Sequence, residues 1–295
     1  GIRDQPRSRG LEMCIRDRFN AVDIIVIGRF SGSRSLAAVG STTALINMFT
    51  NLFIGISLGA NVLSARFYAA GRDKEMSETV HTAITLALIS GILMVFVGLI
   101  FAKPVLELMD TPDDVINLST LYMRIYFLGM PFFMLYNYGA SILRAVGDTK
   151  RPLFFLIIAG IVNAGLNMCL VIIFHLGVAG VAIGTVISQL ISSVLVLRCL
   201  YQSQTSYQLR FSKLKIKGEY LKQIFQVGIP AGIQSTVINF SNVLLQSSVN
   251  SFGSIAMAGY TAANNIFGFL YVTVNAVTQA CMSFTSQNYG VRKFK

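Results

Sequence analysis

The fold class follows from the residues at 79–101, TVHTAITLALISGILMVFVGLIF. This stretch contains no Asp, Glu, Lys or Arg, and its length exceeds the roughly 20 apolar residues that a helix needs to cross a bilayer. A helix is expected because it satisfies its backbone hydrogen bonds internally, as lipid requires. The stretch therefore predicts a transmembrane helix.

The rest of the chain has the same character. Of its 295 residues, 54% are hydrophobic and 13% are charged, whereas soluble domains carry about 25% charged residues. The mean hydropathy is +0.62. Eight apolar segments are recognisable: 19–30, 36–65, 79–101, 117–143, 153–174, 178–200, 221–250 and 255–287. They predict an all-α, polytopic transmembrane helix bundle. Two segments are interrupted by Gly and Pro, at Gly129 with Pro131 and at Gly228 with Pro230, which predicts kinks.

The basic residues that give the chain its net charge of +11 lie mostly in the loops between these segments. Alternate loops carry fifteen basic residues, among them Arg66, Arg72 and Lys74, while the opposite set carries three: Arg29, Arg34 and Lys103. Such asymmetry is typical of cytoplasmic loops. It predicts a native N-terminus inside the cell, and it explains the charge without nucleic acid as a partner.

Cysteine and histidine spacing gives no support to a disulfide framework, a metal site or an enzyme. The four cysteines (Cys14, Cys169, Cys199 and Cys281) form no CxxC pair and no Cys/His ligand pattern. His81 and His175 lie near opposite ends of segments, and no paired carboxylates lie within one. We expect no metal, no cofactor apart from a coupling ion, and no catalytic residues.

A shift of 219 residues aligns positions 20–74 with 239–293 and matches nine of 55 residues, including Gly40 with Gly259 and Thr42 with Thr261. Six segments separate the copies, so both copies run in the same direction, as in transporters built from parallel repeats. We expect an N-lobe over 19–201, a cytoplasmic linker over 202–219, and the first two helices of a truncated C-lobe over 220–295. Residues 1–18 are hydrophilic and hold five Arg where the repeat requires apolar residues, which suggests a non-native segment.

Asp23 is the single carboxylate within an apolar run, AVDIIVIG. An ionised group at the centre of a membrane helix costs at least ~2.5–3.5 kcal/mol, so a proton or cation site is one interpretation and a helix-end Asp that reaches water is the other. Asn163 and Asn167 share one helical face, and Thr185 and Ser188 lie on the next segment. Their oxygens suit a hard cation or a protonated Asp, although such residues also hold helices together.

Four motifs resemble the MATE (multidrug and toxic compound extrusion) transporters. They are VDIIVIGRFSGSRSLAAVG (22–40), LRAVGDTKRPL (143–153), GVAGVAIGTVISQ (177–189) and QVGIPAGIQS (226–235). The resemblance implies two six-helix lobes that alternate between outward- and inward-open states. It also implies a cation or proton site at Asp23, Asn163, Asn167 and Thr185. Asn167 stands where the family often has Asp, so one carboxylate remains, which favours a proton over Na⁺.

By this resemblance, we expect a monomeric H⁺- or Na⁺-coupled antiporter in the inner membrane of a prokaryote. It would export small organic, often cationic, drugs and contact membrane lipid. Tyr126, Met130 and Met134 are candidates for its substrate cavity, although aromatic and Met stripes more often pack helices. A lipid or lipid-linked oligosaccharide flippase of the same superfamily is the alternative; it would need several embedded Arg or Lys, and only Arg124 is present. A channel is a further alternative, which the parallel repeat disfavours.

Overall fold

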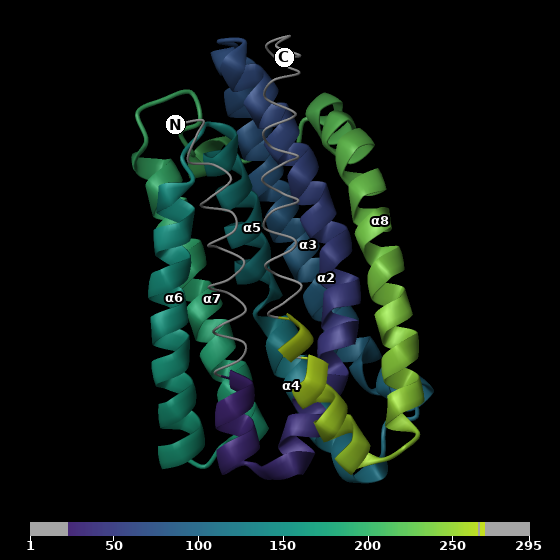
Figure 1. Ribbon diagram of the computed structural model, residues 1–295. Coiled ribbons are helices and arrows are strands. Elements are labelled where there is room, and N and C mark those ends of the chain that lie inside the picture. The colour runs from purple at the N-terminus through teal and green to yellow at the C-terminus, as the bar shows by residue number, and fades with distance from the viewer. Residues whose placement is uncertain (1–22, 265, 269–295) are drawn as a thin grey trace, which may run out of the picture.

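The computed structural model describes residues 23–264 and 266–268, which form a bundle of helices without strands. Residues 23–30 and 254–264 are helical. The elements between them are α2 (Gly32–Ala69), α3 (Asp73–Leu108), α4 (Asp113–Leu128), α5 (Met130–Ala145), α6 (Lys150–Met168), the π-helical turn η2 (Cys169–Ile173), α7 (Gly177–Gln202), the 3₁₀ turn η3 (Phe211–Lys213) and α8 (Gly218–Asn250). In Figure 1, α6 and α7 form one side of the bundle, α8 the other, and α2, α3 and α5 lie between them.

The predicted membrane bundle is confirmed. Among the described residues, α2, α3, α7 and α6 with η2 are each long and apolar enough to cross a membrane, and α4 with α5 makes a fifth span if the bent pair is counted as one. Helix α8 is long but is not among them, because polar residues such as Gln226 and Gln234 dilute its apolar character. The predicted segment 1–18 and most of the eighth apolar segment lie outside the described residues.

The kink expected at Gly129 is present. Helices α4 and α5 meet there at an angle of 49°. A Cβ added at Gly129 would lie 2.8 Å from Cγ2 of Val186 on α7, so the bend brings the backbone close to α7, and a larger residue there would displace Val186. Helix α8 includes Pro230 within its length, and the kink expected there stays a prediction. Near the end of α8 the Asn250 amide donates to the Met109 carbonyl at 3.0 Å.

Helix α8 packs mainly against α2, and glycines form the contact. Gly55 and Gly59 on α2 face Gly228 and Gly232 on α8, so each helix contributes a GxxxG pair. A Cβ on Gly55 would overlap the backbone of Gly232, and one on Gly59 would overlap the carbonyl of Ile224. Small residues allow such close backbone approach, which stabilises helix pairs in membranes without a hydrophobic driving force.

The described part of the second repeat copy agrees with a parallel arrangement. The helical residues 254–264 begin at the same end of the bundle as α2, to which the shift of 219 residues matches them (Figure 1). The two helices also touch: a Cβ on Gly40 would overlap the side chain of Thr261. The lobe boundaries proposed from the sequence stay a prediction.

Residues 203–217, here called the strap, connect α7 to α8 and are fixed to the bundle at several points. The Leu209 N–H donates to the Leu200 carbonyl at 3.0 Å. The Arg210 N–H donates to Nε2 of His81 at 3.1 Å, and the Lys217 N–H donates to Oγ1 of Thr82 at 3.3 Å. The strap is therefore an ordered part of the fold, held on the first turns of α3.

His81 provides a test of this attachment. It is 4% exposed, and its Nδ1 lies 2.6 Å from the Ser77 carbonyl. The two contacts assign a neutral ring with its proton on Nδ1. We expect His81→Phe to leave the Arg210 N–H without its acceptor, at a cost of about 1–3 kcal/mol. Hydrogen exchange of the strap amides should accelerate at least several-fold. His81→Gln, which keeps an acceptor, is the control; equal exchange in both variants would contradict the attachment.

Candidate functional site

Three helical segments meet at a cluster of buried polar side chains. The Asn167 amide, on α6, donates hydrogen bonds to Oδ1 of Asp23 and, at 3.2 Å, to Oδ1 of Asn163. Asn163 and Asn167 are one helical turn apart, so both amides point to the same side of α6. Asp23 is the first described residue of the helix over residues 23–30. The fold thus brings together residues that are 144 positions apart in sequence.

Helix α7 completes the cluster. The Asn163 amide donates to Oγ1 of Thr185 at 3.4 Å, and Thr185 donates to the Val181 carbonyl at 2.9 Å. Ser188, considered as a further ligand, instead donates to the Thr185 carbonyl at 2.8 Å. A chain of hydrogen bonds therefore runs from Asp23 through Asn167 and Asn163 to Thr185. The structure brings together the four residues that the sequence analysis grouped.

The cluster has little access to water. Asp23 is 9% exposed and Asn167 is fully buried. No ion pair joins Asp23 to a basic residue within the described ranges. A buried carboxylate normally requires a proton, a cation or several donors, and the donor seen here is one neutral amide.

The oxygen atoms of the cluster suit a small hard cation or a proton. The carboxylate, the two amide oxygens and the Thr185 hydroxyl are all ligands of that kind. Oδ1 of Asn167 is buried without a hydrogen-bond partner, so it retains a lone pair for a cation, a water molecule or a donor. No group of three His, Cys, Asp or Glu side chains within the described residues has the geometry of a transition-metal site.

Three features of this site were not predicted from the sequence. Gly184 gives Asn167 its space, because a Cβ at Gly184 would overlap Oδ1 of Asn167. The π-helical turn η2 follows directly after α6, and such turns often occur at functional sites. Tyr122 on α4 is buried and close enough to Asp23 for electrostatic interaction. The sequence shows a glycine directly before Thr185 and aromatic residues in the segment 117–143. Neither pattern specifies a contact with Asp23 or Asn167.

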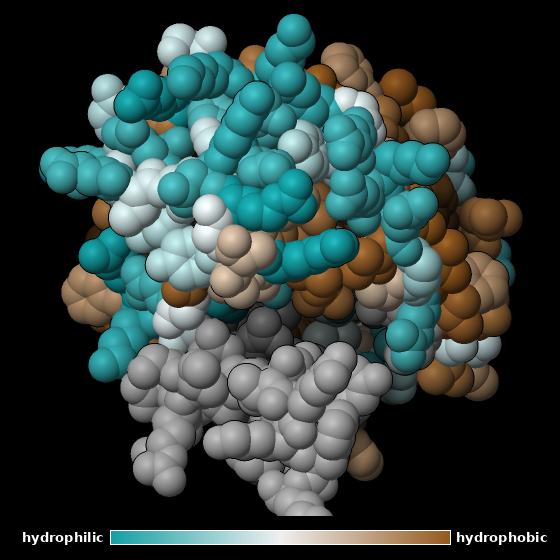
Figure 2. Space-filling model, turned by 90° about the horizontal axis from the view of Figure 1, so that it is seen from above, coloured by the Kyte–Doolittle hydropathy of each residue, from teal (hydrophilic) through white to brown (hydrophobic). Residues whose placement is uncertain are grey.

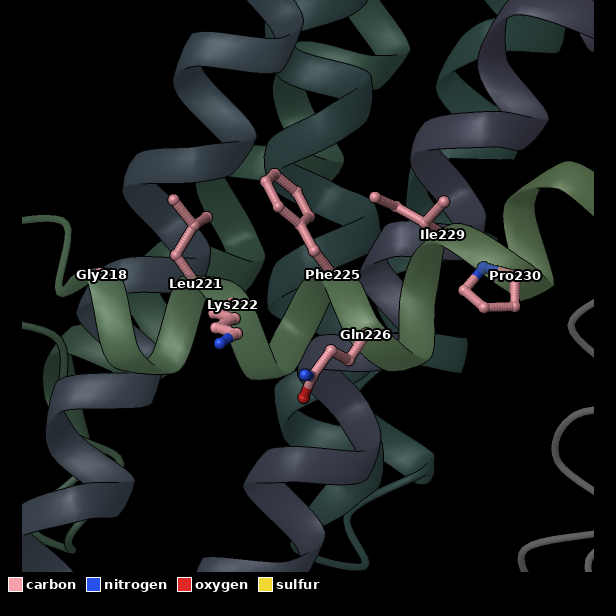
Figure 3. Close-up of a pocket in the computed structure, with 7 residues that line it drawn as sticks. All are labelled: Gly218, Leu221, Lys222, Phe225, Gln226, Ile229 and Pro230. Atoms are coloured by element: carbon pink, nitrogen blue, oxygen red, sulfur yellow. The ribbon is translucent and has the colours of Figure 1, made fainter.

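The proposed substrate-cavity residues lie in the core. Met130 and Met134 are fully buried, and Tyr126 packs beside Tyr122 with ring centroids 6.0 Å apart. Their role in binding substrate stays a prediction. A groove of about 510 Å³ lies elsewhere, near the start of α8, where Figure 3 shows Leu221, Phe225 and Ile229 on one side of the helix.

Comparison with known proteins identifies the family. A sequence profile described as MatE matches residues 10–169 and 230–295, which is most of the chain. The chain belongs to the MatE family. The probable multidrug resistance protein YoeA of Bacillus subtilis is 32% identical over 282 residues, covering 92% of this chain and 60% of that protein. The FAD transporter of Shewanella oneidensis is 24% identical, covering 92% and 61% respectively.

Solved MatE structures share the fold. An outward-facing multidrug resistance transporter superposes with a TM-score of 0.85 at 23% identity, covering 99% of this chain and 65% of that one. The multidrug transporter DinF-BH gives a TM-score of 0.89, also at 23% identity, covering 98% and 65%. The chain thus spans about 60% of the length of the curated relatives it matches.

Proposed function

We propose that the full-length protein is a cation-coupled antiporter, driven by H⁺ or Na⁺, that exports organic and often cationic compounds. The observation that supports this most strongly is the buried carboxylate of Asp23, bonded to a neutral amide and surrounded by oxygen ligands. A site of this kind is stable when a proton or cation occupies it and unstable when it is empty. Multidrug export is named for the Staphylococcus aureus protein MepA, and YoeA is named as a probable multidrug resistance protein.

Coupling would operate through the helices that the cluster joins. Asp23 is linked to α6 and α7 by the hydrogen bonds of Asn167, Asn163 and Thr185. When a proton or cation binds, the carboxylate no longer needs the Asn167 amide, so the packing of residues 23–30 against α6 changes. A change of this kind biases the two states of the transporter only if each state binds the ion with different affinity. One charge crossing 100 mV supplies about 2.3 kcal/mol.

We further propose that the strap end of the bundle faces the cytoplasm of a prokaryote. Helix α2 ends here with Arg66, α3 begins beyond Arg72, and the strap carries further Lys and Arg. Figure 2 views this end and shows hydrophilic residues over much of the described part of it, with hydrophobic ones mostly along one side. The opposite end holds the acidic residues Asp113 and Asp114 at the start of α4. This distribution follows the excess of basic residues in cytoplasmic loops.

The flippase alternative is not favoured. It predicts several basic residues embedded in the bundle to bind pyrophosphate, and the candidate within the described segments, Arg124, is exposed. The relatives named above are a multidrug resistance protein, a multidrug export protein and an FAD transporter. Small organic molecules are therefore the substrate class that we propose, with a monomer as the transporting unit.

Vesicles containing the full-length protein provide the test. A dye such as a cationic rhodamine is loaded, and a proton gradient or a Na⁺ gradient is imposed separately at constant membrane potential. We expect one of the two gradients to drive dye movement and the corresponding ionophore to stop it. Dye movement independent of both gradients would contradict coupling, and no movement under any condition would contradict export.

Gly184→Ala tests the geometry of the cluster without altering any of its polar groups. The added methyl group would overlap Oδ1 of Asn167, so Asn167 must move and its hydrogen bond to Asp23 weakens. Hydrogen bonds to charged groups contribute about 1.5–3 kcal/mol, so we expect gradient-driven efflux to fall roughly tenfold or more. Gly165→Ala, on α6 between the two asparagines, is the control because a Cβ there meets nothing within 4 Å. Equal efflux by both variants would contradict the role of Asn167.

A further inference from the structure

Helix α7 presents a continuous exposed side that ends at the strap. Leu190, Val194 and Tyr201 are all exposed apolar side chains. Their spacing of four and then seven residues places them on one side of the helix, together with the exposed Arg198. Because the other side of α7 is buried in the bundle, this side faces lipid in the membrane. Tyr201 therefore marks the point at which the lipid-facing side of α7 reaches the end of the bundle.

The strap adds a second aromatic ring at this point. Phe211 stacks on Tyr201 with ring centroids 5.8 Å apart and an interplanar angle of 27°. Both rings stay more than half exposed, at 55% and 53%. The backbone of the neighbouring Arg210 is attached to α3 by its N–H bond to His81, which fixes the strap next to Phe211. An exposed, fixed aromatic pair of this kind is typical of the level at which lipid headgroups begin.

The charged residues at the end of α7 and along the strap are all positive. Arg198, Arg210, Lys213 and Lys215 are exposed, and the sequence has no Asp or Glu between Asp148 and Glu219. In the part of the chain that the structure describes, none of these four forms an ion pair, whereas Lys217 pairs with Glu78 at 3.4 Å. The surface thus has unneutralised positive charge beside exposed aromatic and aliphatic groups.

We propose that this surface, formed by Arg198, Tyr201, Arg210, Phe211 and Lys213, binds an anionic phospholipid. The phosphate lies among the basic side chains, and the glycerol and carbonyl region lies against the two rings. The acyl chains follow Val194 and Leu190. Tyr201 lies eleven positions after Leu190, a rise of roughly 16 Å, about half the thickness of a bilayer core, which is the length of one leaflet. Assignment to the cytoplasmic leaflet rests on the orientation given under the proposed function.

A single tryptophan can report this binding. The 295 residues contain no Trp, so Phe211→Trp adds one fluorophore to the surface, and any Trp elsewhere in the full-length protein is replaced by Phe. The protein is reconstituted in phosphatidylcholine vesicles that contain the same fraction of either brominated phosphatidylglycerol or brominated phosphatidylcholine. We expect blue-shifted emission and stronger quenching by the brominated phosphatidylglycerol. Adding Arg210→Gln and Lys213→Gln should reduce this preference roughly 5-fold for each charge removed.

The matched control removes two basic residues from the opposite end, Arg34→Gln with Lys103→Gln, and should keep the preference. Equal quenching by both lipids, emission typical of water, or a preference that survives the Arg210 and Lys213 changes would each overturn the proposal. The experiment does not measure transport. A protein that shows the lipid preference but no gradient-driven efflux would refute the proposed function and leave the lipid site standing.

Discussion

Asp23→Asn abolishes gradient-driven efflux by the full-length protein, and this is the largest effect that we expect. Asn has nearly the same size, and its side-chain oxygen can still accept from the Asn167 amide, so the protein should fold and insert. What it cannot do is exchange a proton or carry the charge that balances a cation. Transport against a gradient then loses its energy source. Dye efflux from energised vesicles should fall to the rate of protein-free vesicles.

The control for this variant is Asp113→Asn, which removes an exposed carboxylate from the first turn of α4. It changes the net charge equally and should leave efflux near that of the unmodified protein. Retention of gradient-driven efflux by Asp23→Asn, in protein that is folded and inserted, would remove Asp23 from the mechanism.

Gly55→Ala should have the second largest effect, which is a loss of protein stability. Alanine usually improves a helix relative to glycine, by about 1 kcal/mol. At Gly55, however, the new methyl group would overlap the backbone of Gly232, which cannot move away as a side chain can. Overpacking costs typically about 1–3 kcal/mol, so α2 and α8 must separate or tilt, and the net change is destabilising. Thermal unfolding in detergent should show a lower midpoint.

Gly259→Ala separates this effect from helix propensity. It lies in the helical residues 254–264, where a Cβ meets nothing within 4 Å, so the same substitution should be neutral or stabilising. If Gly55→Ala unfolds at the same temperature as Gly259→Ala, the close contact between α2 and α8 does not contribute to stability.

The members of the cluster could be picked out from the sequence for physical reasons, whereas their grouping into one site came from the resemblance to the MATE transporters. A carboxylate inside an apolar segment is costly, which drew attention to Asp23, and a spacing of four residues put Asn163 and Asn167 on one face. Gly129 predicted a bend for a similar reason, since glycine and proline weaken a membrane helix locally. Each of these inferences uses residues within a single segment.

Contacts between distant segments were not predictable in the same way. Nothing in the spacing shows that Gly184 makes room for Asn167, or that Gly55 meets Gly232. The order of the strap depends on His81 and Thr82, which precede it by more than 120 residues and look like ordinary helix residues in sequence. Met130 and Met134 illustrate the same difficulty, because a run of apolar residues does not reveal whether it lines a cavity or fills a core.

Coupling through Asp23 is tested by the substrate affinity of the purified full-length protein, measured as pH and Na⁺ concentration are varied. If the coupling ion and the substrate oppose each other through Asp23, linkage requires the ion to weaken substrate binding. We expect affinity to fall either as the pH is lowered or as Na⁺ is raised, and to be insensitive to both in Asp23→Asn. An affinity that ignores both ions in the unmodified protein, or an ion dependence that persists in Asp23→Asn, would contradict the account.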